Sequence, residues 1–122
     1  MSAIPVADDV LDPGIAALPV AEVAAVLELS TSKIRQLLRE GQLIALRREG
    51  ELVIPADFLD ANGIVKGLGG TITVLSDSGF NRTEMLRWLF AADDTLPGTT
   101  PINALRTSHG KEVKRRAQAM AF

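Results

Sequence analysis

Two short amphipathic patterns follow one another near the start of the chain. The first places apolar residues at the spacing of one helix face, at Val20, Val23, Ala24 and Leu27. Pro19 stands just before this run, a position that suits proline at a helix start. The second pattern begins after Ser30 or Thr31, either of which can cap a helix, and ends at Gly41, with an apolar stripe formed by Ile34, Leu37 and Leu38. Two short helices joined by a tight turn are predicted.

Two aliphatic-rich stretches come next, residues 43–48 and 51–54, on either side of the pair Glu49–Gly50. Glycine supplies the positive φ that a tight hairpin turn demands, so these stretches predict a two-stranded β-hairpin, or wing. Pro55 follows, and we expect it to end the strand because it cannot extend a ladder of hydrogen bonds. Helix, turn, helix and hairpin therefore all fall within residues 18–54.

The second half of the chain is helical in pattern. It opens with a glycine-rich stretch that indicates a linker or loop, containing Gly63, Gly67, Gly69 and Gly70. Helices are then predicted from apolar faces at Ile72 and Leu75, at Met85, Leu86, Leu89 and Phe90, at residues 101–105, and at Val113, Ala117 and Met120. Asn81 and Glu84 have the spacing of a capping box, and Thr100 before Pro101 is typical of a helix start.

These patterns predict a mainly α protein: a winged helix-turn-helix with a small two-stranded β-hairpin, followed by a small helical C-terminal domain. We expect three segments: an acidic flexible tail over residues 1–18, the winged helix-turn-helix over 19–62 and the helical domain over 63–122. The tail is assigned because its prolines, glycine and aspartates follow neither a helix nor a strand period.

Composition excludes several classes of protein. A chain of 122 residues has room for one modest core, or for two very small cores that pack on each other, and no run approaches the roughly 18 apolar residues of a membrane span. No signal peptide is visible, so we expect a cytoplasmic, nucleoid-associated protein. Because there is no cysteine and His109 is the single histidine, cysteine or histidine-cluster metal sites are excluded and a Ser-His-Asp triad is improbable. We expect no enzyme activity and no cofactor.

The net charge of −2 argues on its face against a nucleic-acid partner, but the charges are unevenly placed. Residues 1–28 hold five acids and no base. Residues 33–48 reverse this balance, with Lys33, Arg35, Arg39, Arg47 and Arg48 against Glu40 alone. Such asymmetry produces a local positive field on a mildly acidic protein.

The second predicted helix carries the candidate site. Its apolar stripe must face the first helix, which leaves the other side chains for solvent or for double-stranded DNA: Thr31, Ser32, Lys33, Arg35, Gln36 and Arg39. Arg35 and Gln36 have the geometry to pair with base edges, whereas Ser32, Lys33 and Arg39 suit the phosphate backbone. Arg47 and Arg48 would grip phosphate from the wing.

Each of these features also has a plainer interpretation. A basic helix face alone is more often an ordinary solvated surface, and only its coincidence with a tight turn and a basic hairpin favours DNA. A second basic cluster, formed by Arg106, Lys111, Lys114, Arg115 and Arg116, is equally consistent with a solvated helix and with a nonspecific DNA contact. Trp88 sits among apolar residues and is expected in the core or an interface.

The sequence also resembles a known family. The run LPVAEVAAVLELSTSKIRQLLREGQLIALRREGELVIPADF is similar to the winged helix-turn-helix of a small actinobacterial DNA-binding protein family, whose mycobacterial member is a Ser/Thr protein kinase substrate. The runs GFNRTEMLRWLF and TPINALRTSHGKEVKRRAQAMAF resemble the C-terminal helical domain of that family. The resemblance covers nearly everything after the tail, and the second half carries its more specific part.

The resemblance implies DNA binding without enzyme activity, with contacts on Lys33, Arg35, Gln36 and Arg39. The function expected is therefore that of a transcriptional regulator or nucleoid-associated factor. The C-terminal domain is distantly similar to toxin-binding domains of antitoxins, which leaves open an antitoxin-like protein-interaction module, a protein partner or a homodimer through the C-terminal helices.

A Ser/Thr protein kinase is a further expected partner. The tail has no threonine, and its one hydroxyl side chain is Ser2, so control through a tail threonine does not carry over. Phosphate on Ser30, Thr31 or Ser32 would set negative charge against the DNA backbone and weaken binding.

Overall fold

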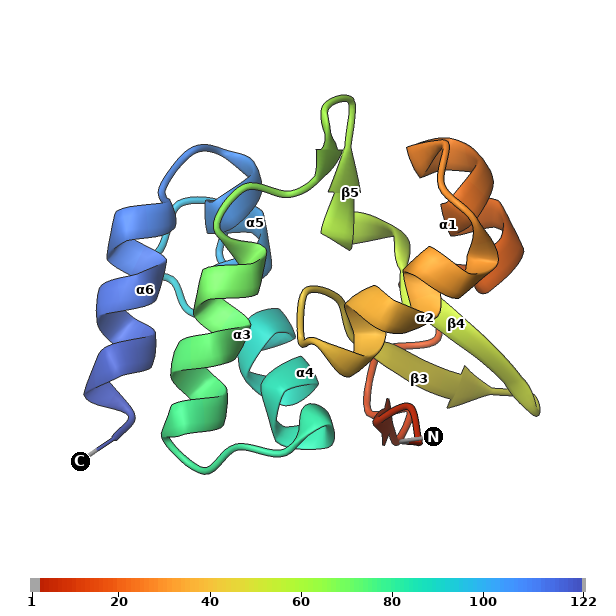
Figure 1. The fold of residues 1–122 in the computed structure, drawn as a ribbon. Helices are drawn as coiled ribbons and strands as arrows, with labels where there is room; N and C mark the ends of the chain where they lie inside the picture. Colours follow the sequence, from red (N-terminus) through yellow and green to blue (C-terminus); the bar gives the residue numbers. More distant parts are fainter. Residues whose placement is uncertain (1–2, 122) are drawn as a thin grey trace.

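The computed structural model describes residues 3–121 and contains, in that range, a four-stranded sheet, a two-stranded antiparallel sheet formed by Leu59–Asp60 and Gly63–Ile64, and six α-helices. In the N-terminal half the elements are β1 (Val6–Ala7), β2 (Ala17–Pro19), α1 (Val20–Leu27), α2 (Thr31–Arg39), β3 (Ala45–Arg48), β4 (Glu51–Pro55) and the short 3-10 helix η1 (Ala56–Phe58). In the C-terminal half they are β5 (Leu59–Asp60), β6 (Gly63–Ile64), α3 (Leu68–Asp77), α4 (Arg82–Phe90), α5 (Pro101–Arg106) and α6 (Gly110–Ala119). The predicted fold class is confirmed, and Figure 1 shows the two halves side by side.

The sheet is larger than the predicted hairpin. It has four strands in the order β1-β3-β4-β2. The hairpin β3–β4 is antiparallel, β2 is antiparallel to β4, and β1 runs parallel to β3. Only the hairpin was predicted, because its two strands are adjacent in sequence while the outer strands are short and come from the N-terminal segment.

The prediction of a flexible tail over residues 1–18 is therefore wrong for the described part, residues 3–18. This segment supplies β1 and most of β2, and it buries Ala7 and Leu11 in the core. Val10 packs partly against the same core. Apolar side chains spaced between the aspartates give the segment enough buried surface to become ordered, although its composition is acidic.

β4 ends at Pro55, as predicted, although Pro55 is itself paired opposite Ala17. Proline has no N–H to donate, but the ladder continues past it because the amide of Ala56 donates to the carbonyl of Ala16 at 2.9 Å. The strand thus tolerates proline at its last residue.

The predicted linker glycines are only partly outside regular structure. Gly63 begins β6, and Gly69 and Gly70 lie in the first turn of α3. Both predicted helix starts in this half are confirmed. Asn81 and Glu84 form a complete capping box, with each of the two hydrogen bonds at 2.9 Å, and Thr100 caps α5.

The prediction that Met120 belongs to the buried face of the last helix is wrong. Val113 and Ala117 are fully buried, but Met120 follows the end of α6 and is 45% exposed. Trp88 is partly buried against the core, as expected for a residue of α4.

The two halves share one continuous hydrophobic core. Phe58 of η1 meets Phe90 of α4, with 5.8 Å between ring centroids. The side chain of Arg106 on α5 donates to the carbonyls of Asp57 and Leu59, so a basic residue of the C-terminal half fastens the chain at the junction. The division at residue 62 stays a prediction, and it falls in the β5–β6 hairpin between the halves.

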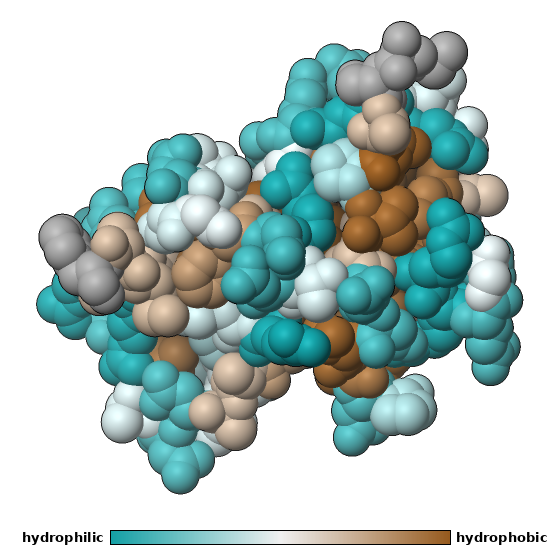
Figure 2. All heavy atoms as spheres, turned by 90° about the horizontal axis from the view of Figure 1, so that it is seen from below, coloured by the Kyte–Doolittle hydropathy of each residue, from teal (hydrophilic) through white to brown (hydrophobic). Residues whose placement is uncertain are grey.

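The face of the molecule drawn in Figure 2 is mostly hydrophilic with small apolar areas. On the face shown in Figure 2, brown atoms gather beside the N-terminal end and in a second, smaller area. Large apolar side chains with substantial exposure include Val6 in β1, and Val26 and Leu29 around the end of α1. Within residues 3–121, no helix is long and apolar enough to cross a bilayer.

Candidate nucleic-acid interface

The turn between α1 and α2 sets the angle at which α2 is presented. Glu28 ends α1 in the left-handed conformation, with φ 57°, and the amide of Leu29 closes back on the carbonyl of Ala24 at 2.9 Å. Ser30 then caps α2 by accepting a 3.0 Å hydrogen bond from the amide of Lys33. Three residues thus end one helix and begin the next.

One face of α2 is fixed against the rest of the N-terminal half. Ile34 and Leu38 are almost completely buried, and Leu37 is partly buried. α1 and α2 pack against each other, and α1 also contacts β2 and β4. The outer face of α2 is therefore left to solvent or to a partner.

The structure brings the predicted α2 residues together on that outer face. All of them are exposed: Thr31, Ser32, Lys33, Arg35, Gln36 and Arg39. No carboxylate within residues 3–121 forms an ion pair with Lys33, Arg35 or Arg39. The positive charges of α2 are thus available to an anionic partner.

Glu40 modifies this face in a way that the sequence analysis missed. It is the C-cap residue of α2, and its carboxylate accepts a 2.9 Å hydrogen bond from the side-chain amide of Gln36. The pair is four residues apart, the spacing at which helical side chains meet, so the signal was present in the sequence. Gln36 is consequently oriented toward the end of α2.

The wing is the β3–β4 hairpin. Its turn residues Glu49 and Gly50 have φ 52° and 78°, the positive pair that a two-residue hairpin turn of this hand requires. Arg47 is exposed, and its guanidinium reaches the carbonyl of Gly50 at 3.3 Å. The hairpin therefore places one exposed guanidinium beside its tip.

Arg48 lies differently from Arg47, because successive side chains of a strand point to opposite faces. Its guanidinium donates to the carboxylate of Asp9 at 2.8 Å and to the carbonyl of Ile15 at 2.8 Å. The bond from Arg48 lowers the pKa of the Asp9 carboxyl, and the same bond raises the pKa of Arg48. This arginine is already engaged by the N-terminal segment.

The start of α2 adds backbone donors to the charged side chains. The Ser30 hydroxyl accepts a hydrogen bond from the amide of Lys33, and the Ser30 carbonyl accepts one from the amide of Ile34. The amides of the first two helical residues point out of the helix end. Such amides, with the helix dipole, favour a negative group. Within residues 3–121 no three His, Cys, Asp or Glu side chains gather as a metal site.

Together these features define a winged helix-turn-helix protein with an appended helical domain. Residues 3–59 match the family described as "DNA-binding protein Rv2175c, wHTH domain", and residues 65–121 match "Rv2175c C-terminal domain of unknown function". The chain belongs to this family. The predicted resemblance is thereby confirmed, while the kinase relation and the likeness to antitoxins stay predictions.

A relative and a solved structure show the same relationship over nearly the whole chain. The DNA-binding protein Rv2175c of Mycobacterium tuberculosis is 42% identical, across all of this chain and 92% of the relative. The NMR structure of Rv2175c superposes with a TM-score of 0.88 at 41% identity, covering 99% of this chain and 91% of that one. The match to the first family domain begins at residue 3, so the N-terminal segment belongs with the winged helix-turn-helix.

Proposed function

We propose that this protein binds double-stranded DNA by placing α2 in the major groove and the β3–β4 wing against the backbone. The observation that carries the proposal is the outer face of α2, where Lys33, Arg35 and Arg39 are exposed without ion-pair partners. The name of the mycobacterial relative supports the same activity. A helix-turn-helix of this kind uses its second helix to reach base edges.

Roles follow from side-chain chemistry. Arg35 can pair bidentately with guanine, and Gln36 can pair with adenine once it leaves Glu40. Ser32, Lys33 and Arg39 suit phosphate oxygens, which position the helix without reading sequence. Thr31 lies at the helix start, where its hydroxyl and the outward amides favour the same backbone.

The wing contributes mainly through Arg47. Arg48 would have to break its ion pair with Asp9 before it could bind a phosphate, so its first role is to hold the N-terminal segment onto the sheet. The proposal therefore assigns the wing contact to one arginine and leaves Arg48 as a support.

A net charge of −2 limits the affinity of this single interface. We expect binding to weaken steeply with salt, because most of it arises from counterion release at phosphates. Sequence discrimination should be loose for one chain, since one helix in one groove reads few base pairs. A nucleoid-associated factor or a regulator that pairs on the DNA both fit this behaviour.

The test is fluorescence anisotropy of the full chain with short labelled duplexes across a range of salt. Lys33→Ala combined with Arg35→Ala should abolish most of the binding at every salt concentration. Arg87→Ala is the control, because Arg87 is exposed on α4 and belongs to neither α2 nor the wing.

Two results would contradict the proposal. One is an absence of binding by the natural chain even at low salt; the other is unchanged affinity in the Lys33/Arg35 variant while its circular dichroism shows an intact fold. Either result would direct attention to a protein partner of the C-terminal helices.

A further inference from the structure

A basic cleft lies in the C-terminal half, between the β5–β6 hairpin and the starts of α3 and α6. It encloses about 890 Å³, and its rim carries three lysines, Lys66, Lys111 and Lys114. This volume is within the range of sites that take a whole ligand rather than a lone ion. Most of the cleft lining belongs to the domain that the family describes as of unknown function.

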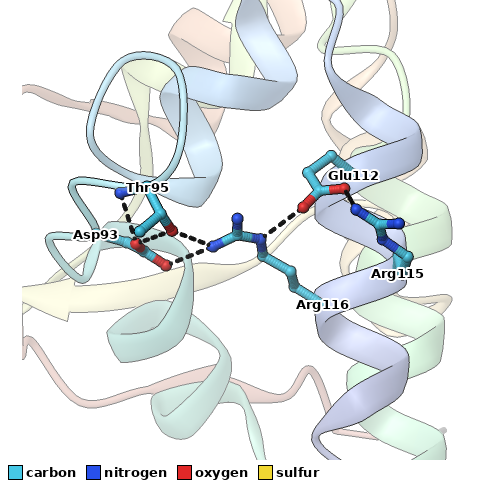
Figure 3. Close-up of polar contacts among 5 residues, drawn as sticks. All are labelled: Asp93, Thr95, Glu112, Arg115 and Arg116. Carbon is cyan, nitrogen blue, oxygen red and sulfur yellow. Dashed lines mark hydrogen bonds and ion pairs between the residues drawn. The ribbon is translucent and has the colours of Figure 1, made fainter.

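Of the arginines of the C-terminal cluster, Arg106 lines this cleft, whereas Arg115 and Arg116 lie outside its lining and pair with carboxylates. Figure 3 shows Arg116 between two acidic side chains, with 2.9 Å contacts to both Asp93 and Glu112. Arg115 also pairs with Glu112. Arg106 is bound to backbone carbonyls at the junction of the halves. The predicted basic cluster is thus partly neutralised within the fold.

The three lysines have no such partners. None of them forms an ion pair with a carboxylate in the described range, and all three are exposed. Two carboxylates line the cleft, Asp60 and Glu112, against the three lysines and Arg106, and Glu112 is already paired with Arg115 and Arg116. The cleft therefore presents an excess of uncompensated positive charge.

The floor of the cleft reinforces this charge. The helices α3 and α6 run in the same direction and begin side by side (Figure 1), so close that a Cβ on Gly67 would lie 3.9 Å from the Cα of Gly110. Neither helix start has a side-chain cap, and α3 has no acid in its first turn. Two positive helix ends thus face the same opening as the lysines.

From this arrangement we infer that the basic cleft is a second DNA contact, which takes phosphates of the backbone. Lysine acts on phosphate as a point charge, and the cleft lining has no Phe, Trp or Tyr on which a base could stack. A duplex keeps its bases stacked inside and offers phosphates outside, which matches this lining better than a nucleotide does. The inference rests on the proposed function and gives the C-terminal half a part in it.

Amide chemical shifts followed by two-dimensional NMR separate the two surfaces. Duplex DNA added to the full chain should shift the amides of Gly69, Gly70, Gly110 and Lys111 as well as those of α2. Shifts on α2 alone would overturn the second contact and leave the proposed function standing. Shifts at the cleft alone would overturn the proposed contact by α2 and leave the cleft contact standing. A spectrum that does not change when duplex is added would overturn both contacts.

Substitution then measures the contribution of the lysines. Replacing Lys66, Lys111 and Lys114 together with Gln should lower the slope of log affinity against log salt by about three, and reduce affinity about equally for all duplex sequences. Lys111→Gln alone is compared with Arg87→Gln, which changes the net charge by the same amount outside the cleft. Equal effects of these two single changes would overturn the inference.

Inorganic phosphate serves as the second probe in the same NMR experiment. Weak shifts at the cleft amides with phosphate, and stronger ones with duplex at far lower concentration, support a polymeric phosphate ligand. Shifts with phosphate that duplex does not reproduce would mean a small-anion site and overturn the DNA contact.

Discussion

Arg48 of the wing and Asp9 of the N-terminal segment form an ion pair at 2.8 Å, across 39 positions of sequence. The pair fastens β1 and the loop after it beside β3, the strand that leads to the tip of the wing. Ile15 adds its carbonyl to the same guanidinium. An arginine that belongs to the basic segment of the sequence is thereby used for the architecture of the sheet.

Asp9→Asn should therefore destabilise the fold slightly, by up to about 1 kcal/mol, because partly exposed pairs contribute little. The pKa of Asp9 is lowered from its ordinary value of 3.8 in the folded protein, chiefly by the bond from Arg48. The carboxylate thus contributes stability above that value, and the contribution is lost as pH falls through the folded pKa.

Urea denaturation of the natural chain and of Asp9→Asn measures this effect. The difference in unfolding free energy should be present near neutral pH and vanish in acid. Asp8→Asn is the matched control, since Asp8 is exposed and forms no ion pair among the described residues. Equal losses in both variants would show that the pair is not the cause.

Glu40→Gln should strengthen DNA binding. The substitution removes a negative charge from the end of the proposed recognition helix and keeps an acceptor for Gln36. It also removes an acid from a helix C-terminus, where negative charge is unfavourable, so stability should not fall. We expect a gain of about two- to tenfold in affinity at low salt, shrinking as salt rises.

Anisotropy titrations compare this variant with Glu22→Gln, which makes the same charge change in the first turn of α1. An equal gain in both variants would mean that only the net charge of the protein had changed. No gain in Glu40→Gln would argue that this end of α2 lies away from the phosphates.

The sequence was sufficient where structure is local. The spacing of Ile34, Leu37 and Leu38 predicted α2 and its outer face, and Asn81 with Glu84 predicted a cap that the structure contains. In each case the deciding contacts join residues a few positions apart, so the pattern holds the necessary information.

The sequence was insufficient where partners are distant. Nothing beside Asp9 or Arg48 marks their pairing, and the acidic composition of the first segment concealed two strands that exist only because β3 and β4 offer their edges. The same holds for the basic cleft, whose Lys66 lies far in sequence from Lys111. The sequence predicted that the DNA-contact residues of α2 are exposed. It did not predict that Arg48 is bound to Asp9 and to the carbonyl of Ile15.

Gly98→Ala should destabilise the loop between α4 and α5 by about 2 kcal/mol or more, because two costs combine. Gly98 has φ 78°, and a Cβ there would lie 2.6 Å from the Cβ of Asn103 in α5. Gly70→Ala is the comparison, since a Cβ at Gly70 meets nothing within 4 Å and α3 would gain up to about 1 kcal/mol of helix propensity. Thermal unfolding should move in opposite directions for the two variants, and a shared direction would contradict these local assignments.

Arg116→Met should loosen the packing of α6 against the loop before α5 and lower the urea midpoint near neutral pH. The methionine keeps the aliphatic stem but removes the guanidinium that joins Asp93 to Glu112, as Figure 3 shows.

The pKa of Asp93 is lowered mainly by hydrogen bonds from Thr95, with Arg116 adding to the effect, and the pKa of Glu112 is lowered mainly by Arg116. Both carboxylates therefore contribute stability above their ordinary values of 3.8 and 4.5, and the contribution is lost as pH falls through the folded values. The gap in midpoint between Arg116→Met and the natural chain should accordingly close in acid. A gap that persisted after both carboxylates were protonated would mean that Arg116 acts through contacts other than these ion pairs, such as its hydrogen bond to the Thr95 hydroxyl. An Arg116→Lys variant with an intermediate gap near neutral pH would favour the charge.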